Sequence, residues 1–260
     1  MTLRIIPQNT YISQIPLIGS FYSKFDLDVK KYGFIKALKI NMDKVGIKIK
    51  TIKNFQTDKI LKEKTVILIS NHPYTVEPLF LLSSLPNRKN FYMIADSQFL
   101  NQGENIDHYL IPVYVKHHYL GKIKIRNRFL HAFSNNYCLS LEKAREKNRQ
   151  SIYLASQKLS QGNMIIIFPN FAGRKDWLPG ISYLIKQYEG KQDLYFVRSY
   201  LKNTKKIDIF RFIPILNKIM PQIEVIFDKP QKINHLLTKE PKEIVNILEE
   251  NYNDWVKTIE

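Results

Sequence analysis

The chain has 260 residues, 44% of them hydrophobic, which is enough to build a core and excludes a disordered protein. Its 40 Lys and Arg residues outnumber 23 Asp and Glu residues, and the net charge of +17 favours an anionic partner, such as a phospholipid surface, nucleic acid, an acidic carrier protein or a phosphorylated substrate. The single cysteine, Cys138, excludes a disulfide framework and a multi-cysteine metal site, and it predicts a reducing compartment.

The N-terminal part of the chain predicts helix. We expect an irregular or short-helical lead over residues 1–25 and a basic amphipathic helix over residues 26–43. One face of that helix is apolar, and its lysines lie largely elsewhere, namely Lys30, Lys31, Lys36 and Lys39. Such a helix either covers the core with solvated lysines or lies in a membrane interface, where these lysines would meet anionic head groups and Phe34 would enter the lipid. We assign residues 1–44 to an N-terminal amphipathic helical segment and residues 45–260 to a catalytic domain.

Strands and helices alternate through the rest of the chain. Apolar residues alternate with polar ones over residues 45–50, as in a half-exposed strand, whereas residues 65–70 are nearly all apolar, as in a strand buried on both faces. Further strands are predicted over residues 91–95, 110–115, 164–168 and 194–200, and helices over residues 78–85, 151–160 and 241–259. Residues 116–150 predict a basic surface excursion.

This order of elements predicts an α/β fold. We expect a central mixed, largely parallel sheet flanked by helices, with an N-terminal helical lead and a C-terminal docking helix. No apolar run reaches the roughly 20 residues that a membrane-spanning helix needs, and the N-terminus lacks the pattern of a secretory signal.

Candidate catalytic residues follow the buried strand, where residues 71–78 read Asn-His-Pro-Tyr-Thr-Val-Glu-Pro. His72 and Glu77 are five positions apart and would meet poorly on one continuous helix, so we expect His72 in a loop and Glu77 at the start of a helix. The positive end of the helix dipole favours an ionised Glu77 there. A carboxylate that orients one imidazole nitrogen leaves the other free to accept a proton, so the pair predicts a general base and its orienter.

The His-x4-acid spacing is weak evidence when taken alone. His235 and Glu240 have the same spacing, but they follow no buried strand and lie in a polar lead-in to the terminal helix. We treat that second pair as a coincidence. The structural alternative for His72 is a capped loop histidine with no catalytic task.

The stretch over residues 45–82, with its Asn-His-x4-Glu-Pro, resembles the first motif of the glycerol-phosphate and lysophospholipid acyltransferase family, which is usually Asn-His-x4-Asp. Residues 162–174, Gly-Asn-Met-Ile-Ile-Ile-Phe-Pro-Asn-Phe-Ala-Gly-Arg, are similar to the family's Phe-Pro-Glu-Gly motif. Residues 111–116 resemble its second motif, with Lys116 where a basic residue is common. The resemblance covers about residues 45–200.

This resemblance implies that His72 and Glu77 form the catalytic dyad. It also implies an acceptor-binding set composed of Asn71, Lys116, Phe168, Pro169, Asn170, Gly173, Arg174 and Lys175. Arg174 and Lys175 suit a phosphate, because a guanidinium forks onto phosphate oxygens, although a structural salt bridge explains Arg174 equally well. Glu77 replaces the usual Asp, Asn170 the usual Glu and Phe171 the usual Gly, which leaves the acceptor open.

The leading hypothesis is an O-acyltransferase that moves a fatty acyl group from an acyl thioester to a hydroxyl of a lysophospholipid-like acceptor. We expect acyl-coenzyme A or acyl carrier protein as co-substrate, an anionic membrane surface as partner, and neither a cofactor nor a metal ion. The location would be peripheral, on the cytoplasmic side of a membrane. The alternatives are a non-catalytic membrane lipid-binding protein of the same fold and an RNA-binding module, although no nucleic-acid motif is present and we expect no nucleic-acid partner.

Overall fold

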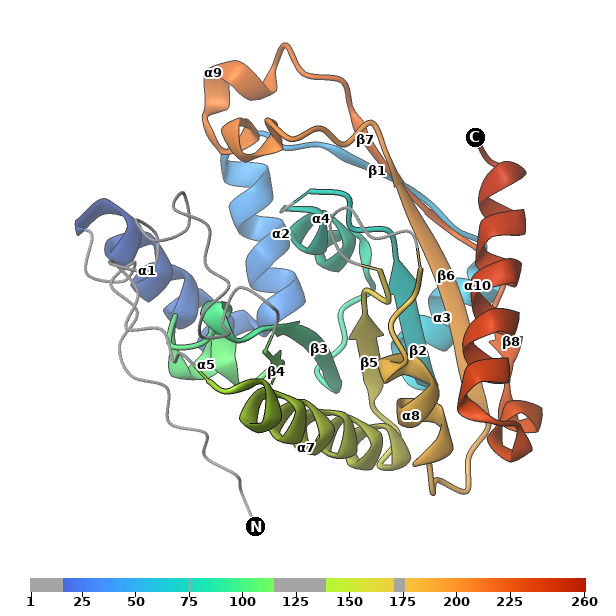
Figure 1. Cartoon of the computed structure of the whole chain (residues 1–260). Coiled ribbons are helices and arrows are strands. Elements are labelled where there is room, and N and C mark those ends of the chain that lie inside the picture. The colour runs from blue at the N-terminus through green and yellow to red at the C-terminus, as the bar shows by residue number, and fades with distance from the viewer. Residues whose placement is uncertain (1–15, 75, 115–138, 171–175) are drawn as a thin grey trace.

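A sheet of eight strands forms the centre of the molecule in the part of the chain that the computed structural model describes, residues 16–74, 76–114, 139–170 and 176–260 (Figure 1). The strand order is β1-β7-β6-β2-β5-β3-β4, and β8 pairs with β6. The strands are β1 (Ile49–Ile52), β2 (Thr65–Ser70), β3 (Phe91–Asp96), β4 (Leu110–Val113), β5 (Met164–Ile167), β6 (Leu194–Lys202), β7 (Ile223–Phe227) and β8 (Gln231–Lys232).

Helices surround this sheet. The α-helices are α1 (Pro16–Tyr32), α2 (Phe34–Lys44), α3 (Phe55–Glu63), α4 (Glu77–Ser84), α5 (Glu104–Asp107), α7 (Leu141–Ser160), α8 (Gly180–Lys186), α9 (Pro214–Asn217) and α10 (Pro241–Lys257). Short 3-10 helices are η2 (Ser97–Phe99), η4 (Asp208–Phe212) and η5 (Asn234–Thr238).

The central strands run in one direction. The pairs β6–β2, β2–β5, β5–β3 and β3–β4 are parallel, whereas β7 and β8 pair antiparallel with β6. The carboxyl ends of β2, β3, β4, β5 and β6 therefore share one edge of the sheet, which we call the carboxyl edge. This mixed, largely parallel sheet, with helices before, around and after it, confirms the predicted fold class.

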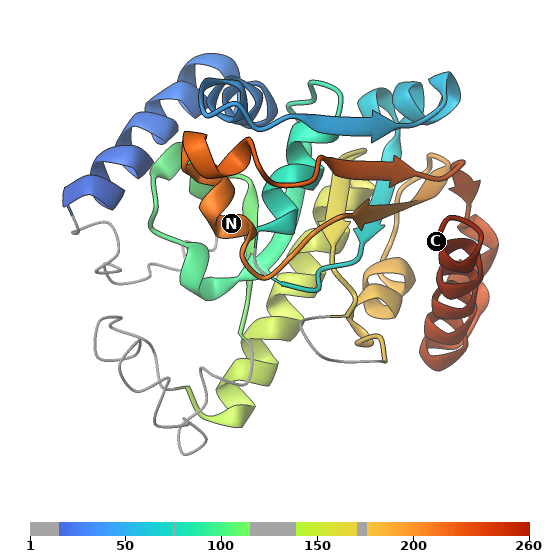
Figure 2. The ribbon, with the colours of Figure 1, turned by 90° about the horizontal axis from the view of Figure 1, so that it is seen from above.

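Each face of the sheet is covered by its own hydrophobic cluster. Val66 and Leu68 of β2 point into a cluster with α1, α2 and α4, whereas Ile67 and Ile69 point into one with α7, α8 and α10. Figure 2 shows α1 and α2 on the opposite side of the strands from α7 and α8. All six residues of β2 are buried, so this strand lies between two apolar layers, as its run of apolar residues predicts.

The predicted amphipathic helix is two helices. Gly33 separates α1 from α2 with φ at +79°, a left-handed backbone conformation that glycine adopts without steric cost. The prediction of one helix over residues 26–43 is wrong because a lone glycine inside a helical pattern does not by itself mark a break.

The expectation that Phe34 enters a membrane is also wrong. Its side chain is buried and packs edge-on against Phe25, Phe91 and Tyr109. Lys39, expected to meet head groups, instead donates to the carbonyl of Leu85 at 2.6 Å. These helices share the cluster that covers β2 on one face. The division of the chain at residue 44 stays a prediction.

Two further boundaries differ from the sequence prediction by four residues or more. β1 begins at Ile49 and not at Val45, because its pairing with β7 starts at Ile49 opposite Ile223. α7 begins at Leu141, where Ser140 caps it, so the helix takes in the last ten residues of the predicted excursion. Most of that excursion, residues 116–138, lies outside the described part. No helix in the described ranges is long and apolar enough to cross a membrane.

A buried arginine holds together the edge opposite to the carboxyl edge. Arg88 donates from Nε to the carbonyl of Asn90 at 2.8 Å, from Nη1 to those of Leu61 and Lys64 at 3.0 and 2.7 Å, and from Nη2 to that of Gly162 at 3.0 Å. These carbonyls lie just before β2, β3 and β5. Burial lowers the pKa of Arg88 to about 10, which leaves the guanidinium charged at neutral pH.

Replacement of Arg88 tests this arrangement. Arg88→Met should lower the free energy of unfolding by about 3 kcal/mol, because four backbone carbonyls lose their charged donor. Urea denaturation followed by circular dichroism would measure the change. The matched control is Lys89→Met at the exposed neighbouring position, which should stay within about 0.5 kcal/mol of the wild type. Equal effects of the two substitutions would contradict the structural role of Arg88.

Candidate active site

The polar residues that follow the buried strand β2 lie at the carboxyl edge of the sheet. Asn71 and His72 follow Ser70 directly, and α4 begins five residues after His72, at Glu77, with Pro78 in its first turn. Proline suits this position because it has no N–H to leave unpaired and its φ is already helical. Polar groups at this edge of a parallel sheet are where α/β proteins bind and transform ligands.

His72 and Glu77 form a hydrogen bond across the loop. The distance from His72 Nδ1 to Glu77 Oε2 is 3.0 Å, as the sequence predicts for a histidine in the loop and a carboxylate at the helix start. The Glu77 side chain is fully buried, whereas 18% of the His72 side chain is exposed. A buried carboxylate thus faces an imidazole that solvent can reach.

The carboxylate favours one imidazole tautomer. Glu77 is an acceptor when ionised, so the bond requires a proton on Nδ1 of His72 and leaves Nε2 of the neutral ring as a base. Within the described residues, Nε2 makes no hydrogen bond, and the second oxygen of Glu77, Oε1, has no partner. The pair therefore has the arrangement of a general base with its orienter, and Nε2 is the ring nitrogen left free to accept a proton.

Asn71 fixes the strand end next to the dyad. Its Nδ2 donates to the carbonyl of Leu201 at 3.1 Å, and its Oδ1 accepts the N–H of Leu201 at 2.8 Å. The side chain thus continues the ladder between β2 and β6 beyond Ser70. The sequence assigned Asn71 to substrate binding, and that role stays a prediction, but these two bonds favour a positioning role for the residue that precedes His72.

The end of β5 lies beside the end of β2. The ring of Phe168 packs against that of His72 with their centroids 5.0 Å apart, and the carbonyl of Pro169 accepts the N–H of Leu178 at 2.9 Å. Asn170 is half-buried. The two motifs predicted to face one substrate therefore meet at one edge, as far as the described residues reach, and the substrate-binding roles of Phe168, Pro169 and Asn170 stay predictions.

The basic residues expected to bind the acceptor are not described by the structure. Gly173, Arg174 and Lys175 fall in the undescribed range 171–175, and Lys116 falls in the undescribed range 115–138. Their assignment to substrate binding therefore stays a prediction. The partnership of Asn71 with Leu201 was missed, because nothing in the sequence relates two residues 130 positions apart.

No protein-family model and no curated protein matches the chain. Among solved structures, it is similar to the 1-acyl-sn-glycerophosphate (LPA) acyltransferase PlsC from Thermotoga maritima, with 12% sequence identity, over 96% of this chain and 94% of that chain, at a TM-score of 0.49. The local geometry around His72 is therefore the stronger guide to function.

The bond between His72 and Glu77 predicts a spectroscopic signature. In two-bond proton–nitrogen spectra, the neutral His72 ring should be the tautomer with its proton on Nδ1, because that proton bonds the carboxylate. Glu77→Gln should shift the ring toward a mixture of tautomers. His235, which is exposed and makes no ring hydrogen bond within the described ranges, serves as internal reference. A neutral His72 with its proton on Nε2 in the wild type would contradict the arrangement.

Proposed function

We propose that the chain is an O-acyltransferase that moves a fatty acyl group from an acyl thioester to the hydroxyl of a lysophospholipid-like acceptor. The observation that supports this most is the 3.0 Å bond between His72 Nδ1 and the buried Glu77, at the carboxyl edge of the sheet. The base and its orienter are present, and the acceptor itself supplies the hydroxyl nucleophile. The resemblance of residues 45–82 and 162–174 to acyltransferase motifs supports the same reaction.

The proposed reaction needs no acyl-enzyme. Nε2 of His72 takes the proton of the acceptor hydroxyl as its oxygen attacks the thioester carbonyl carbon, and Glu77 stabilises the imidazolium that forms. The tetrahedral intermediate then collapses, the carbon–sulfur bond breaks, and the imidazolium returns the proton to the departing thiolate. The products are an ester and a free thiol.

The charge of the chain suits the proposed substrates. Acyl-coenzyme A carries phosphates and acyl carrier protein is acidic, so either donor is complementary to a chain with a net charge of +17. A lysophospholipid acceptor resides in a bilayer, so we propose that the protein works as a peripheral protein at an anionic membrane surface on the cytoplasmic side. Arg174 and Lys175 remain the proposed contacts for the acceptor's phosphate.

A non-catalytic lipid-binding protein is the second candidate. Asn170 supports it, because this half-buried residue follows Pro169 at the end of β5, where the resembling family usually has a glutamate. Binding of vesicles with no thiol release from any donor would favour this candidate.

Substitution of the dyad tests the mechanism. His72→Ala should lower kcat/KM for thiol release by a factor on the order of 10³, because the general base is lost. Glu77→Gln should lower it by about 10²–10⁴, because the amide no longer imposes the tautomer or stabilises the imidazolium. Glu77→Asp, which keeps the carboxylate on a shorter arm, should restore part of the rate.

The matched control is His235→Ala, since His235 and Glu240 share the sequence spacing of the dyad but His235 is exposed in η5. This variant should react at the wild-type rate. The assay would offer acyl-coenzyme A and acyl carrier protein with a panel of lysolipids, and follow thiol release and lipid mass. Full turnover by folded His72→Ala protein would rule out the proposed mechanism.

A further inference from the structure

The segment that joins β6 to β7, residues 203–222, exposes large apolar side chains. We call it the β6–β7 loop; it contains η4 and α9. Of the fourteen large hydrophobic residues that are exposed in the described part of the chain, five lie in these 20 residues. They are Ile207, Ile209, Phe210, Ile213 and Ile219, with exposed fractions from 46% to 81%. Such a concentration on a folded surface marks an interaction site.

The β6–β7 loop is held in place by its own bonds. Asn203, with φ at +64°, donates from its side chain to the carbonyl of Gln222 at 2.9 Å and so closes the base of the loop. Asn217 donates to the carbonyl of Gly46 after α2, and Phe212 packs against the core cluster that includes α2. The exposed apolar side chains therefore stand on a fixed base.

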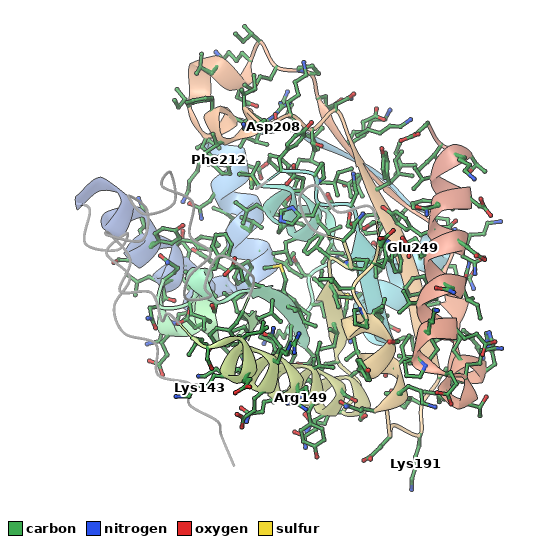
Figure 3. The ribbon with its side chains drawn as sticks, viewed as in Figure 1. Lys143, Arg149, Lys191, Asp208, Phe212 and Glu249 are labelled. Carbon is green, nitrogen blue, oxygen red and sulfur yellow. The ribbon has the colours of Figure 1, made fainter. Side chains whose placement is uncertain are left out.

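The loop presents positive charge and no exposed carboxylate. Its one acidic residue, Asp208, is buried and accepts a bond from Arg211 Nε at 2.8 Å, while its other oxygen accepts the N–H of Lys205 at 2.6 Å. Asp208 and Phe212 are labelled in the loop at the top of Figure 3. The side chains of Lys205, Lys206 and Lys218 are exposed. The surface is thus apolar and cationic together.

The loop starts next to the dyad. β6 runs parallel to β2, and Asn71, the residue before His72, bonds the backbone of Leu201, two positions before the loop begins. In Figure 1, α9 lies beyond the end of α2, on the side toward which the arrow of β5 points. The loop and His72 therefore belong to the same edge of the molecule.

We propose that the β6–β7 loop is the surface that inserts into the interface of an anionic membrane. The isoleucines and Phe210 would enter the acyl boundary while Lys205, Lys206 and Lys218 contact anionic head groups. This proposal rests on the proposed function, because insertion of the β6–β7 loop would bring His72 to an acceptor that resides in the bilayer. Binding to vesicles can nevertheless be measured without any transfer reaction.

Other partners fit this surface less well. A symmetric dimer through the loop would set its three lysines against their own copies, and like charges repel. Proteins that bind single-stranded nucleic acid stack bases on aromatic rings, whereas four of the five exposed apolar side chains here are isoleucines. A lipid interface accepts aliphatic side chains and lysines together.

The test is co-sedimentation with phosphatidylglycerol vesicles and with phosphatidylcholine vesicles, at low and high salt. The variant Ile209→Ser/Phe210→Ser/Ile219→Ser should bind phosphatidylglycerol vesicles more than about tenfold less tightly than the wild type. The matched control is Phe55→Ser/Tyr153→Ser, which removes exposed rings from α3 and α7 and should bind as the wild type does. The variant Lys205→Gln/Lys206→Gln/Lys218→Gln should bind phosphatidylglycerol vesicles less tightly, and its binding should depend less on salt.

Thiol release with a short-chain lysolipid in free solution separates this inference from the proposed function. The serine variant should keep wild-type transfer to that acceptor, since it touches no dyad residue. Equal vesicle binding by wild-type and serine variants, no binding by the wild type, or a dimer that the serine variant dissociates would each overturn the membrane assignment while leaving the transfer reaction standing. If the serine variant loses vesicle binding and neither it nor the wild type transfers an acyl group, the membrane surface is upheld and the acyltransferase proposal is refuted.

Discussion

The buried carboxylate of Glu77 is the constraint on which the candidate site depends. A carboxylate removed from water costs several kcal/mol unless a donor compensates it, and within the described residues His72 is the side chain that does so. α4 cannot rotate to expose Glu77, because Phe80, Leu81 and Leu82 are fully buried in the core. Packing of the helix therefore holds the carboxylate in place, and the carboxylate in turn holds the imidazole.

The two edges of the parallel sheet have different roles, one in stability and one in the candidate site. At the starts of β2, β3 and β5, Arg88 donates hydrogen bonds to backbone carbonyls and so links the three strands. After β2 and β5, the same strands end in His72 and Phe168, whose rings touch. Because these strands are parallel, groups that follow each of them arrive together at one edge. The β6–β7 loop starts from that edge, since β6 shares the direction of β2.

Local patterns predicted much of the fold. The buried strand over residues 65–70 and the terminal helix α10 lie where the sequence predicts them, because burial of a strand on two faces and helical spacing of apolar residues each leave a short-range pattern. The break at Gly33 and the burial of Phe34 were missed. An amphipathic pattern identifies an apolar face without saying whether protein or lipid covers it.

The sequence by itself determined the proposed dyad, because His72 and Glu77 lie five residues apart and are positioned by one strand end and one helix start. The tertiary structure decided what surrounds them. Leu201 bonds Asn71 from 130 positions away, Phe168 packs on the imidazole from the neighbouring strand, and Asp208 is buried with Arg211 while the apolar residues around it are exposed. Contacts between strands distant in the chain, and the choice of which apolar side chains stay in solvent, depend on how the whole sheet assembles, and no local pattern encodes them.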